Sequence, residues 1–328
     1  MGKLDGRVAV VTGAGRGIGR GVAKLLAAEG ASVVVNDFGV NVDGSAPDAG
    51  PAKDVCDEIK SAGGKASPNF DTVATMEGGE RMVQQALDEF GRLDILINVA
   101  GILRDRMIFN MSEQEWDDVI AVHLKGHFAT TKPASIIMRQ QRSGRIINYS
   151  SISGLGGLPG QANYGAAKAG IAGFTRVVAR DLGRYGVTCN AISPGAATRM
   201  TATIPSNAGQ LRARAGTASA APRPAPRPAA RASTVPPMRE PEYVAPMTVF
   251  LACDEAWNIN GKIFYVAGGR ISLAHEESAM RQIQKQGMWT VDELRELVPS
   301  QLMYGLVNPA PPAADLDVPG RAVAASSG

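Results

Sequence analysis

The sequence carries a serine, a tyrosine and a lysine whose types and spacing could move a proton. Ser151 lies thirteen residues before Tyr164, and Lys168 follows Tyr164 by four residues, or about one helical turn. A phenol has a pKa of about 10 and is a poor acid or base at neutral pH. We expect the neighbouring ammonium to favour the phenolate and lower that pKa. Such a tyrosine could take the proton of an alcohol while a hydride leaves, with Ser151 orienting the reacting oxygen.

A glycine-rich loop near the N-terminus predicts a dinucleotide site. The segment TGAGRGIG (residues 12–19) follows an apolar run and opens a helical pattern. Such a loop turns tightly and lets backbone N–H groups approach a pyrophosphate at the helix N-terminus. The alternative is a turn whose glycines serve only a positive φ. The cofactor residues predicted in this loop are Gly13, Arg16, Gly17, Ile18 and Gly19.

A carboxylate after the second apolar run bears on the choice of cofactor. Asp37 closes the run ASVVVND. A carboxylate there can accept hydrogen bonds from the ribose 2′-OH and would repel a 2′-phosphate, whereas Arg16 favours the phosphorylated cofactor. We therefore predict NAD, with NADP as the alternative. Asp71, after the third run, could accept a hydrogen bond from the adenine amino group or cap a turn, and Thr72 beside it is included among the predicted cofactor residues.

The elements that must position these residues alternate along the chain. Apolar runs predict buried strands at residues 7–13, 31–37, 65–71, 93–101, 144–151, 187–195 and 262–269. Helical periodicity predicts helices at 17–30, 51–62, 76–90, 112–139, 163–184 and 241–254. Such alternation implies parallel strands joined by right-handed crossovers. The predicted fold is therefore a single-domain α/β protein, a Rossmann-type doubly wound parallel sheet that binds ligands at the carboxyl ends of its strands.

Composition limits the classes of partner. The formal net charge is +3, but residues 205–239 hold six arginines and no lysine or acidic residue, so removing them leaves −3. The remainder thus has no bias toward nucleic acid. We find no apolar run of about 20 residues, and hence expect no membrane span.

His123 and His127 could share a helix face, yet no third ligand completes a metal set. The start lacks a secretory pattern and the three cysteines lie far apart, which together predict a cytoplasmic protein.

Three segments differ from the rest of the chain. We predict one Rossmann domain over residues 1–270, interrupted by the low-complexity segment 205–239, which has seven prolines and ten alanines. A helical extension is expected at 271–307, where Thr290 and Glu293 form a capping-box pattern. Residues 308–328 are predicted to be a disordered tail.

The motifs TGAGRGIG, INVAG, SS…YGAAK and SPG resemble the short-chain dehydrogenase/reductase family over about residues 4–270. The resemblance implies that Ser151 binds the substrate oxygen, that Tyr164 is the acid–base group, and that Lys168 holds ribose hydroxyls and lowers the tyrosine pKa. The family's second asparagine is Val99 here, and the stretch after SPG is one residue short. Besides Tyr164 and Lys168, the cofactor contacts that the resemblance implies are Asn98, Ala100, Gly101, Pro194, Gly195 and Thr198.

Further segments, among them NVAGILRDRMIF, VHLKGHF and GQANYGAAKAG, resemble the dehydrogenase unit of peroxisomal multifunctional enzyme type 2. This likeness implies NAD-dependent oxidation of (3R)-hydroxyacyl-CoA, and a homodimer or homotetramer. His123 stands where many family members carry a fourth catalytic asparagine, and is predicted to be catalytic by that position. The alternatives are a 3-oxoacyl-thioester reductase, a hydroxysteroid dehydrogenase, and a non-catalytic nucleotide-binding interaction protein.

The likeness stops between Ile204 and Glu240, where the family forms a mobile lid over the substrate. An arginine clamp for CoA phosphates is one interpretation of residues 205–239. An unstructured insertion and a local frameshift in the gene are the two others, and we rank the clamp below both.

Overall fold

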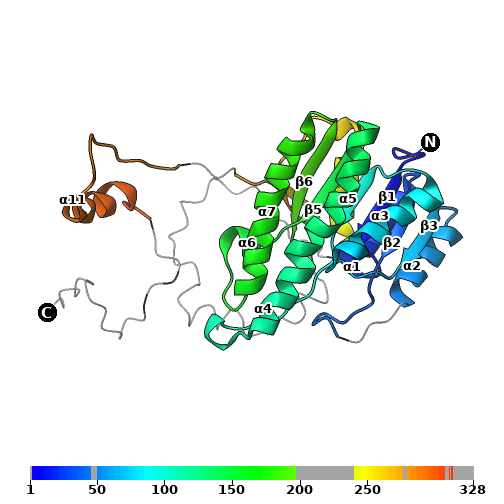
Figure 1. Cartoon of the computed structure of the whole chain (residues 1–328), viewed down its shortest axis with the longest axis horizontal. Helices are drawn as coiled ribbons and strands as arrows, with labels where there is room; N and C mark the ends of the chain where they lie inside the picture. Colours follow the sequence, from blue (N-terminus) through cyan, green and yellow to red (C-terminus); the bar gives the residue numbers. More distant parts are fainter. Residues whose placement is uncertain are drawn as a thin grey trace. The chain divides into compact units, whose positions relative to one another are not determined.

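The computed structural model describes residues 2–45, 50–196, 240–275 and 279–306, together with residues 310 and 312. The described residues fall into two units: one that holds the sheet and reaches Ala274, and a second that begins at His275 (Figure 1). Thr198 and residues 205–239, for which the sequence made predictions, lie outside the described residues, as does all but two residues of 308–328.

The first unit is built on one eight-stranded sheet. Strands β1 to β7 pair in parallel, and β8 joins β7 antiparallel. The order across the sheet is β3-β2-β1-β4-β5-β6-β7-β8. The predicted doubly wound α/β fold is therefore confirmed. The strands are β1 (Val8–Thr12), β2 (Ser32–Asn36), β3 (Lys65–Asn69), β4 (Ile95–Asn98), β5 (Gly144–Tyr149), β6 (Val187–Pro194), β7 (Ile263–Ala267) and β8 (Arg270–Leu273).

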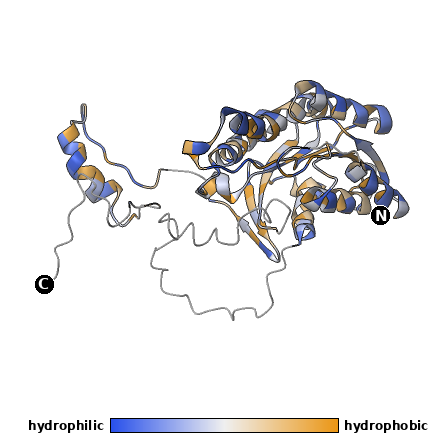
Figure 2. Cartoon of the chain, turned by 90° about the horizontal axis from the view of Figure 1, so that it is seen from below, coloured by the Kyte–Doolittle hydropathy of each residue, from blue (hydrophilic) through white to orange (hydrophobic). Residues whose placement is uncertain are grey.

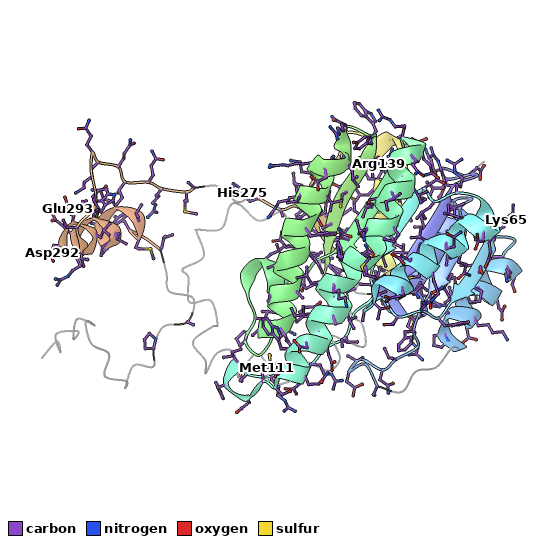
Figure 3. All side chains as sticks on the ribbon, in the orientation of Figure 1. Lys65, Met111, Arg139, His275, Asp292 and Glu293 are labelled. Atoms are coloured by element: carbon purple, nitrogen blue, oxygen red, sulfur yellow. The ribbon has the colours of Figure 1, made fainter. Side chains whose placement is uncertain are left out.

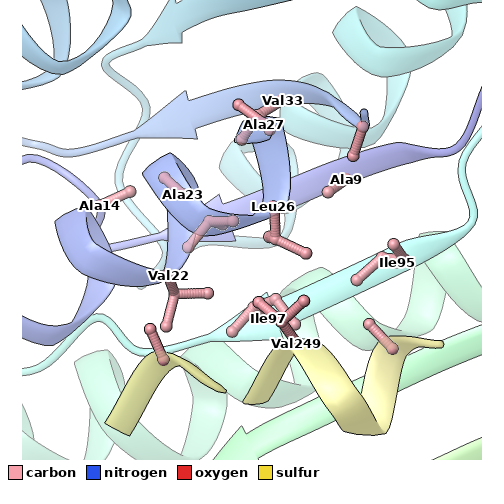
Figure 4. Close-up of a cluster of buried hydrophobic side chains, with 14 of the residues drawn as sticks. Ala9, Ala14, Val22, Ala23, Leu26, Ala27, Val33, Ile95, Ile97 and Val249 are labelled. Carbon is pink, nitrogen blue, oxygen red and sulfur yellow. The ribbon is translucent and has the colours of Figure 1, made fainter. Parts of the chain in front are cut away.

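Helices cover both faces of this sheet (Figure 1). Side chains of α1, α2 and α10 form one buried cluster with alternate strand residues, and those of α3, α5 and α7 form another with the residues between them. Figure 4 shows Val22 and Leu26 of α1 packed near Ile97 of β4 and Val249 of α10. These helices are α1 (Gly17–Ala28), α2 (Gly50–Ser61), α3 (Met76–Phe90), α5 (Gly126–Gln141), α7 (Ala162–Gly183) and α10 (Ala245–Ala252).

Short elements connect the strands to these helices. The long helical region predicted at 112–139 is two helices, α4 (Glu113–Ile120) and α5, joined by a π-helical turn at Ala121–Lys125. The short helix α6 (Ile152–Gly156) follows β5, and 3₁₀ turns lie at Ile108–Asn110, Pro241–Val244 and Asp254–Ala256. In Figure 2 the strands are mostly apolar, whereas the outer faces of the helices are polar. Within the described residues, no helix combines the length and apolar character needed to cross a bilayer.

A row of buried polar side chains crosses the sheet near its carboxyl edge. Asn69, Asn36, Thr12, Asn98 and Asn148 stand in register on five neighbouring strands. Asn36 Nδ2 donates to Asn69 Oδ1 at 2.7 Å, and Asn98 Nδ2 donates to Asn148 Oδ1 at 3.0 Å. Buried polar groups are stable only when they are hydrogen-bonded, so these pairs fix how the strand ends lie relative to one another.

The helical extension predicted for residues 271–307 differs from the structure in its first part. Residues 270–273 form β8, because Gly268 and Gly269 make a two-residue hairpin turn after β7, with Gly268 at φ 55°. Residues 279–289 are not helical. Short helices depend on packing an apolar face, and Met280 and Met288 are exposed.

The second unit is helical in the later part of the predicted extension, where the capping-box pattern lies. The predicted capping box is confirmed: Glu293 N donates to Thr290 Oγ1 and Thr290 N donates to the Glu293 carboxylate, at the start of α11 (Val291–Leu297). Figure 3 labels Glu293 and Asp292 on this helix. Lys285 Nζ also donates to Glu293 Oε2 at 2.6 Å, so one carboxylate serves both the cap and an ion pair.

The polar row gives a prediction about stability. Asn148→Ala removes the partner of Asn98 Nδ2, which then keeps only a 3.4 Å contact with Thr131 Oγ1. A buried polar group left unpaired costs about 1–3 kcal/mol, so we expect urea denaturation to show a loss of about 2 kcal/mol in the free energy of unfolding. The exposed Asn110→Ala is the matched control and should change it by less than about 0.5 kcal/mol. Equal effects of the two variants would contradict a stabilising role for the row.

Candidate active site

Lys168 links helix α7 to the sheet. Its side chain is buried on α7, and Nζ donates to the carbonyl oxygen of Tyr149, the last residue of β5, at 2.6 Å. In the opposite direction, Ser150 Oγ donates to the carbonyl oxygen of Lys168 at 2.8 Å. These two hydrogen bonds fix α7 against the end of β5 and thereby fix Ser151 relative to Tyr164.

The structure brings Ser151, Tyr164 and Lys168 together. Ser151 is the N-cap of α6, where Oγ accepts a hydrogen bond from Ser153 N at 3.2 Å, and its side chain lies close enough to Tyr164 to lower the pKa of the phenol. Lys168 Nζ lies 5.5 Å from the centre of the Tyr164 ring. A hydroxyl, a phenol and an ammonium therefore meet beside the carboxyl end of β5, as their spacing in the sequence predicts.

The pKa values of this site differ from the sequence-based expectation. Burial raises the pKa of Tyr164 to about 12, the hydrogen bond from Ser151 opposes this, and the charge of Asp105 adds to it. Burial also lowers the pKa of Lys168 to about 7. For the protein residues alone the shift is therefore opposite in direction to the lowering expected from Lys168, because desolvation is the largest influence on the pKa of the phenol.

A second strand-end loop closes against this site. After β4, Arg106 N donates to the carbonyl oxygen of Gly160 at 2.8 Å, and Gln161 Nε2 donates to Asp105 Oδ2 at 2.7 Å. Asn163, buried before Tyr164, donates from Nδ2 to two backbone carbonyl oxygens of the 104–115 segment at 3.0 and 2.9 Å. The sequence analysis missed these residues, although the run GQANY holds three of them and Asn163 directly precedes the tyrosine.

His123 reaches the site from the helix side. It lies in the π-helical turn, and its ring meets the ring of Tyr164 edge to face with centroids 5.1 Å apart. Nε2 lies 2.8 Å from the carbonyl oxygen of Ile102. The histidine thus contacts the ring of the tyrosine, and its catalytic role stays a prediction.

The glycine loop fits a dinucleotide pyrophosphate. A Cβ added at Gly13 would lie 2.7 Å from Ala100 Cα, and one at Gly19 would lie 2.2 Å from Gly13 O, so these glycines allow close backbone packing. Gly17 has φ +54°, and the space around its Cα is open. Arg16 is the N-cap of α1 and makes no side-chain capping bond. The first N–H groups of α1, including that of Ile18, therefore have no side-chain cap, which suits an anion at a helix N-terminus.

Asp37 accepts hydrogen bonds from the glycine loop and from the segment that follows β2. Oδ2 accepts a hydrogen bond from Gly15 N at 2.8 Å, and Oδ1 accepts one from Gly39 N at 2.7 Å. A carboxylate oxygen can accept more than one hydrogen bond, so Asp37 still has capacity for a ribose hydroxyl. Asp37 thus directly follows β2, and from this position it is predicted to favour NAD over NADP.

Asp71 and Thr72 are engaged with neighbouring residues. Asp71 Oδ1 accepts from Arg81 Nε at 2.7 Å, and Oδ2 accepts from Asn69 Nδ2 at 2.9 Å. Thr72 Oγ1 accepts from Ala74 N at 3.2 Å, which is a turn-stabilising bond. Thr72 therefore stabilises the turn, whereas these two hydrogen bonds of the Asp71 carboxylate come from side chains and do not support the capping alternative for Asp71. Cofactor contacts by both residues stay predictions.

The remaining predicted cofactor residues lie at the ends of β4 and β6. Asn98 is buried and its amide is engaged with Asn148 and Thr130, so its side chain supports the strand ends from within. Ala100 N donates to Thr12 Oγ1 at 3.2 Å. Pro194 ends β6, Gly195 N donates to the carbonyl oxygen of Val266 at 2.8 Å, and Gly101 packs against His123.

Comparison with known proteins identifies related sequences. A family model described as short chain dehydrogenase matches residues 7–209. Hydroxyacyl-CoA dehydrogenase ChsB1 of Mycobacterium tuberculosis is 40% identical over 304 residues, which cover 89% of this chain and 87% of that protein. Peroxisomal multifunctional enzyme type 2 of Mus musculus is 39% identical over 284 residues, 87% of this chain. The match spans only 35% of the mouse enzyme's length.

A solved structure agrees with these matches. A short chain dehydrogenase from Mycobacterium avium has a TM-score of 0.75 and 45% sequence identity. The match covers 92% of this chain and 96% of that one. Among the described residues, no group of three or more His, Cys, Asp or Glu side chains is arranged to hold a metal ion.

The charge of Asp105 gives a prediction about the tyrosine. Asp105→Asn removes one of the two influences that raise the pKa of Tyr164, so we expect that pKa to fall, by up to about one unit. An absorbance titration of tyrosinate measures it, with the same titration of an added Tyr164→Phe variant subtracted to isolate this residue. The control is Asp117→Asn, which changes an exposed carboxylate on α4. An unchanged or raised pKa in Asp105→Asn would contradict the prediction.

Proposed function

We propose a function for this chain from one premise: the chain belongs to the short-chain dehydrogenase family. We infer that it is an oxidoreductase that interconverts a secondary alcohol and a ketone with a nicotinamide dinucleotide. The substrate that we propose is a (3R)-3-hydroxyacyl-CoA, which becomes a 3-oxoacyl-CoA. The observation that carries this function is the placement of Tyr164 beside Ser151 and within 5.5 Å, ring centre to Nζ, of a buried Lys168.

Each of the three residues has a separate task in the proposed reaction. A nicotinamide held at the glycine loop would supply the acceptor for the hydride that leaves the carbon carrying the hydroxyl group. Tyr164, as phenolate, accepts the proton of that hydroxyl, and in the reverse direction it returns the proton to the ketone oxygen. Ser151 hydrogen-bonds to the reacting oxygen and to Tyr164, which holds both in line. Lys168, which donates one hydrogen to Tyr149 O, would offer its remaining donor hydrogens to the cofactor ribose.

The proposed cofactor site uses the glycine loop and the strand ends. The uncapped N-terminus of α1 would hold the pyrophosphate, and Asp37 would accept hydrogen bonds from the ribose 2′-OH. We propose NAD over NADP because a carboxylate at this position repels a 2′-phosphate. Arg16 at the start of α1 works in the opposite direction, so the choice depends on which of the two side chains lies nearer the ribose.

The substrate class rests on the relatives. The Mycobacterium tuberculosis relative is named as a hydroxyacyl-CoA dehydrogenase, and the mouse relative is a multifunctional enzyme of which this chain matches about a third. A 3-oxoacyl-thioester reductase and a hydroxysteroid dehydrogenase would use the same three residues. The deciding experiment is a substrate panel of 3-hydroxyacyl-CoA esters and hydroxysteroids, each with NAD and with NADP. A preference for steroids, or no oxidation of any 3-hydroxyacyl-CoA, would overturn the proposed substrate.

Tyr164→Phe tests the proton transfer. This variant removes the phenolic oxygen but leaves the glycine loop untouched, so NAD binding should persist. Turnover should fall by at least about 10²-fold, the usual contribution of general acid–base catalysis. Both are measured by steady-state kinetics and by a fluorescence titration with NADH. Tyr304→Phe, in an exposed position, is the matched control and should keep normal turnover. Near-normal turnover of Tyr164→Phe would rule out the mechanism.

Asp37→Ala tests the cofactor preference. The ratio of kcat/KM with NAD to that with NADP should narrow or invert, because the variant removes the repulsion of a 2′-phosphate. Affinity for both cofactors should also decline, since Asp37 holds Gly15 N and Gly39 N. The ratio is therefore the decisive quantity, and Asp54→Ala on the exposed side of α2 is the control. A wild-type enzyme that already prefers NADP would show that Arg16 dominates.

A further inference from the structure

His123 connects the two sides of the proposed site. It is 1% exposed and lies in the π-helical turn between α4 and α5. Such turns are frequent at functional sites, because the extra residue redirects the side chains around it. The ring of His123 stands nearly perpendicular to the ring of Tyr164, at an interplanar angle of 88°. This edge-to-face arrangement is the one that aromatic rings prefer, and it restrains the tilt of the tyrosine ring.

The same imidazole holds the backbone that follows β4. Nε2 lies 3.1 Å from Ile102 N and 2.8 Å from Ile102 O, so either tautomer makes a hydrogen bond to this residue. A Cβ added at Gly101 would lie 2.2 Å from His123 Cε1, which means that the ring occupies the space a side chain would need. Gly101 and its neighbours are the predicted cofactor contacts of β4. One side chain therefore contacts the cofactor loop and the catalytic ring.

The surroundings of His123 disfavour its charged form and engage part of the residue in hydrogen bonds. Burial, and to a lesser degree the charge of Lys168, hold its pKa well below the usual range. Its carbonyl oxygen accepts hydrogen bonds from His127 Nδ1 at 2.7 Å and from Gly126 N. His123 Nδ1 has no hydrogen-bond partner within the part of the chain that the structure describes. Nε2 and the carbonyl oxygen of His123 are thus both held by neighbouring groups of the protein.

We propose that His123 is a positioning residue, which sets the orientation of the Tyr164 ring and couples it to the Gly101–Ile102 backbone. This assignment differs from the catalytic role that the position of His123 in the sequence predicts. It rests on the proposed function in so far as Tyr164 is the acid–base group. The coupling itself is a property of the fold, because it consists of one ring contact and one hydrogen bond that separate substitutions can remove.

Two substitutions separate the two contacts. His123→Gln keeps an amide that can hydrogen-bond to Ile102 and loses the ring. Because Tyr164 is then less restrained, kcat should fall by roughly tenfold while the Kd of NADH changes little. His123→Phe keeps the ring and loses the hydrogen bond. We expect it to weaken NADH binding by roughly tenfold, with a smaller effect on kcat. Thermal unfolding of both variants identifies any loss that comes from instability.

The pH profile distinguishes positioning from proton transfer. If His123 only positions its neighbours, the pH dependence of kcat/KM keeps its shape in both variants. The exposed His275→Asn serves as the matched histidine control. A step with a pKa near that of an ordinary histidine, present in wild type and absent from both variants, would overturn the inference. The inference would also be overturned if both variants lost kcat and NADH affinity to the same degree, in proportion to their loss of thermal stability.

The failure of this inference can be told apart from failure of the proposed function. NADH binding is measured without any substrate, and the tyrosinate titration reports on Tyr164 directly. If wild type oxidises no 3-hydroxyacyl-CoA, the proposed substrate fails. The orientation of the Tyr164 ring in crystals of His123→Gln still decides the inference: a changed ring tilt supports it, and an unchanged tilt contradicts it.

Discussion

The site depends first on the hydrogen bond from Lys168 Nζ to Tyr149 O. Burying an ammonium group is unfavourable, and the lowered pKa of Lys168 reflects that desolvation. The bond offsets part of the penalty by giving one donor hydrogen a strong acceptor at 2.6 Å. Since Ser150 returns a bond to the backbone of Lys168, α7 cannot slide along β5 without breaking both links. The relative placement of Ser151 and Tyr164 follows from this constraint.

The polar row across the sheet serves the same purpose on a larger scale. Parallel strands bring the cofactor loop after β1, the loop after β4 and Ser151 after β5 to one edge. Their mutual placement is useful only if the strands keep their register. Apolar packing alone specifies register weakly for strands that are apolar on both faces, because neighbouring positions look alike. Thr12, Asn98 and Asn148 remove that ambiguity, since a shift by one residue would leave buried amides without partners.

The order of strands and helices could be predicted from the sequence because apolar runs and helical periodicity are local signals. The group of Ser151, Tyr164 and Lys168 and the glycine loop could also be predicted. Residues four apart share a helix face, and a loop that follows an apolar run lies at a strand end. The strand β8 was missed although Gly268–Gly269 is a recognisable hairpin signal. The direction of the Tyr164 pKa shift could not be predicted, because it depends on burial by segments distant in sequence. Contacts of Asp105 with Gln161, and of His123 with Tyr164, are likewise properties of the folded chain.

In this site the hydrogen bonds of the protein determine the geometry, and burial affects which groups are charged. The described residues fix the positions of the phenol, the hydroxyl and the ammonium through backbone carbonyls and neutral side chains. Burial disfavours the ionised forms of both Tyr164 and Lys168, which raises the pKa of the first and lowers that of the second. If Tyr164 transfers a proton as we propose, an added positive charge close to the phenol would favour its phenolate. An oxidised nicotinamide would carry such a charge, so in this proposal the protonation state of the site would be coupled to cofactor binding. A neutral His123 suits this arrangement, because a charged imidazole at 5.1 Å would bias Tyr164 toward the phenolate regardless of what is bound.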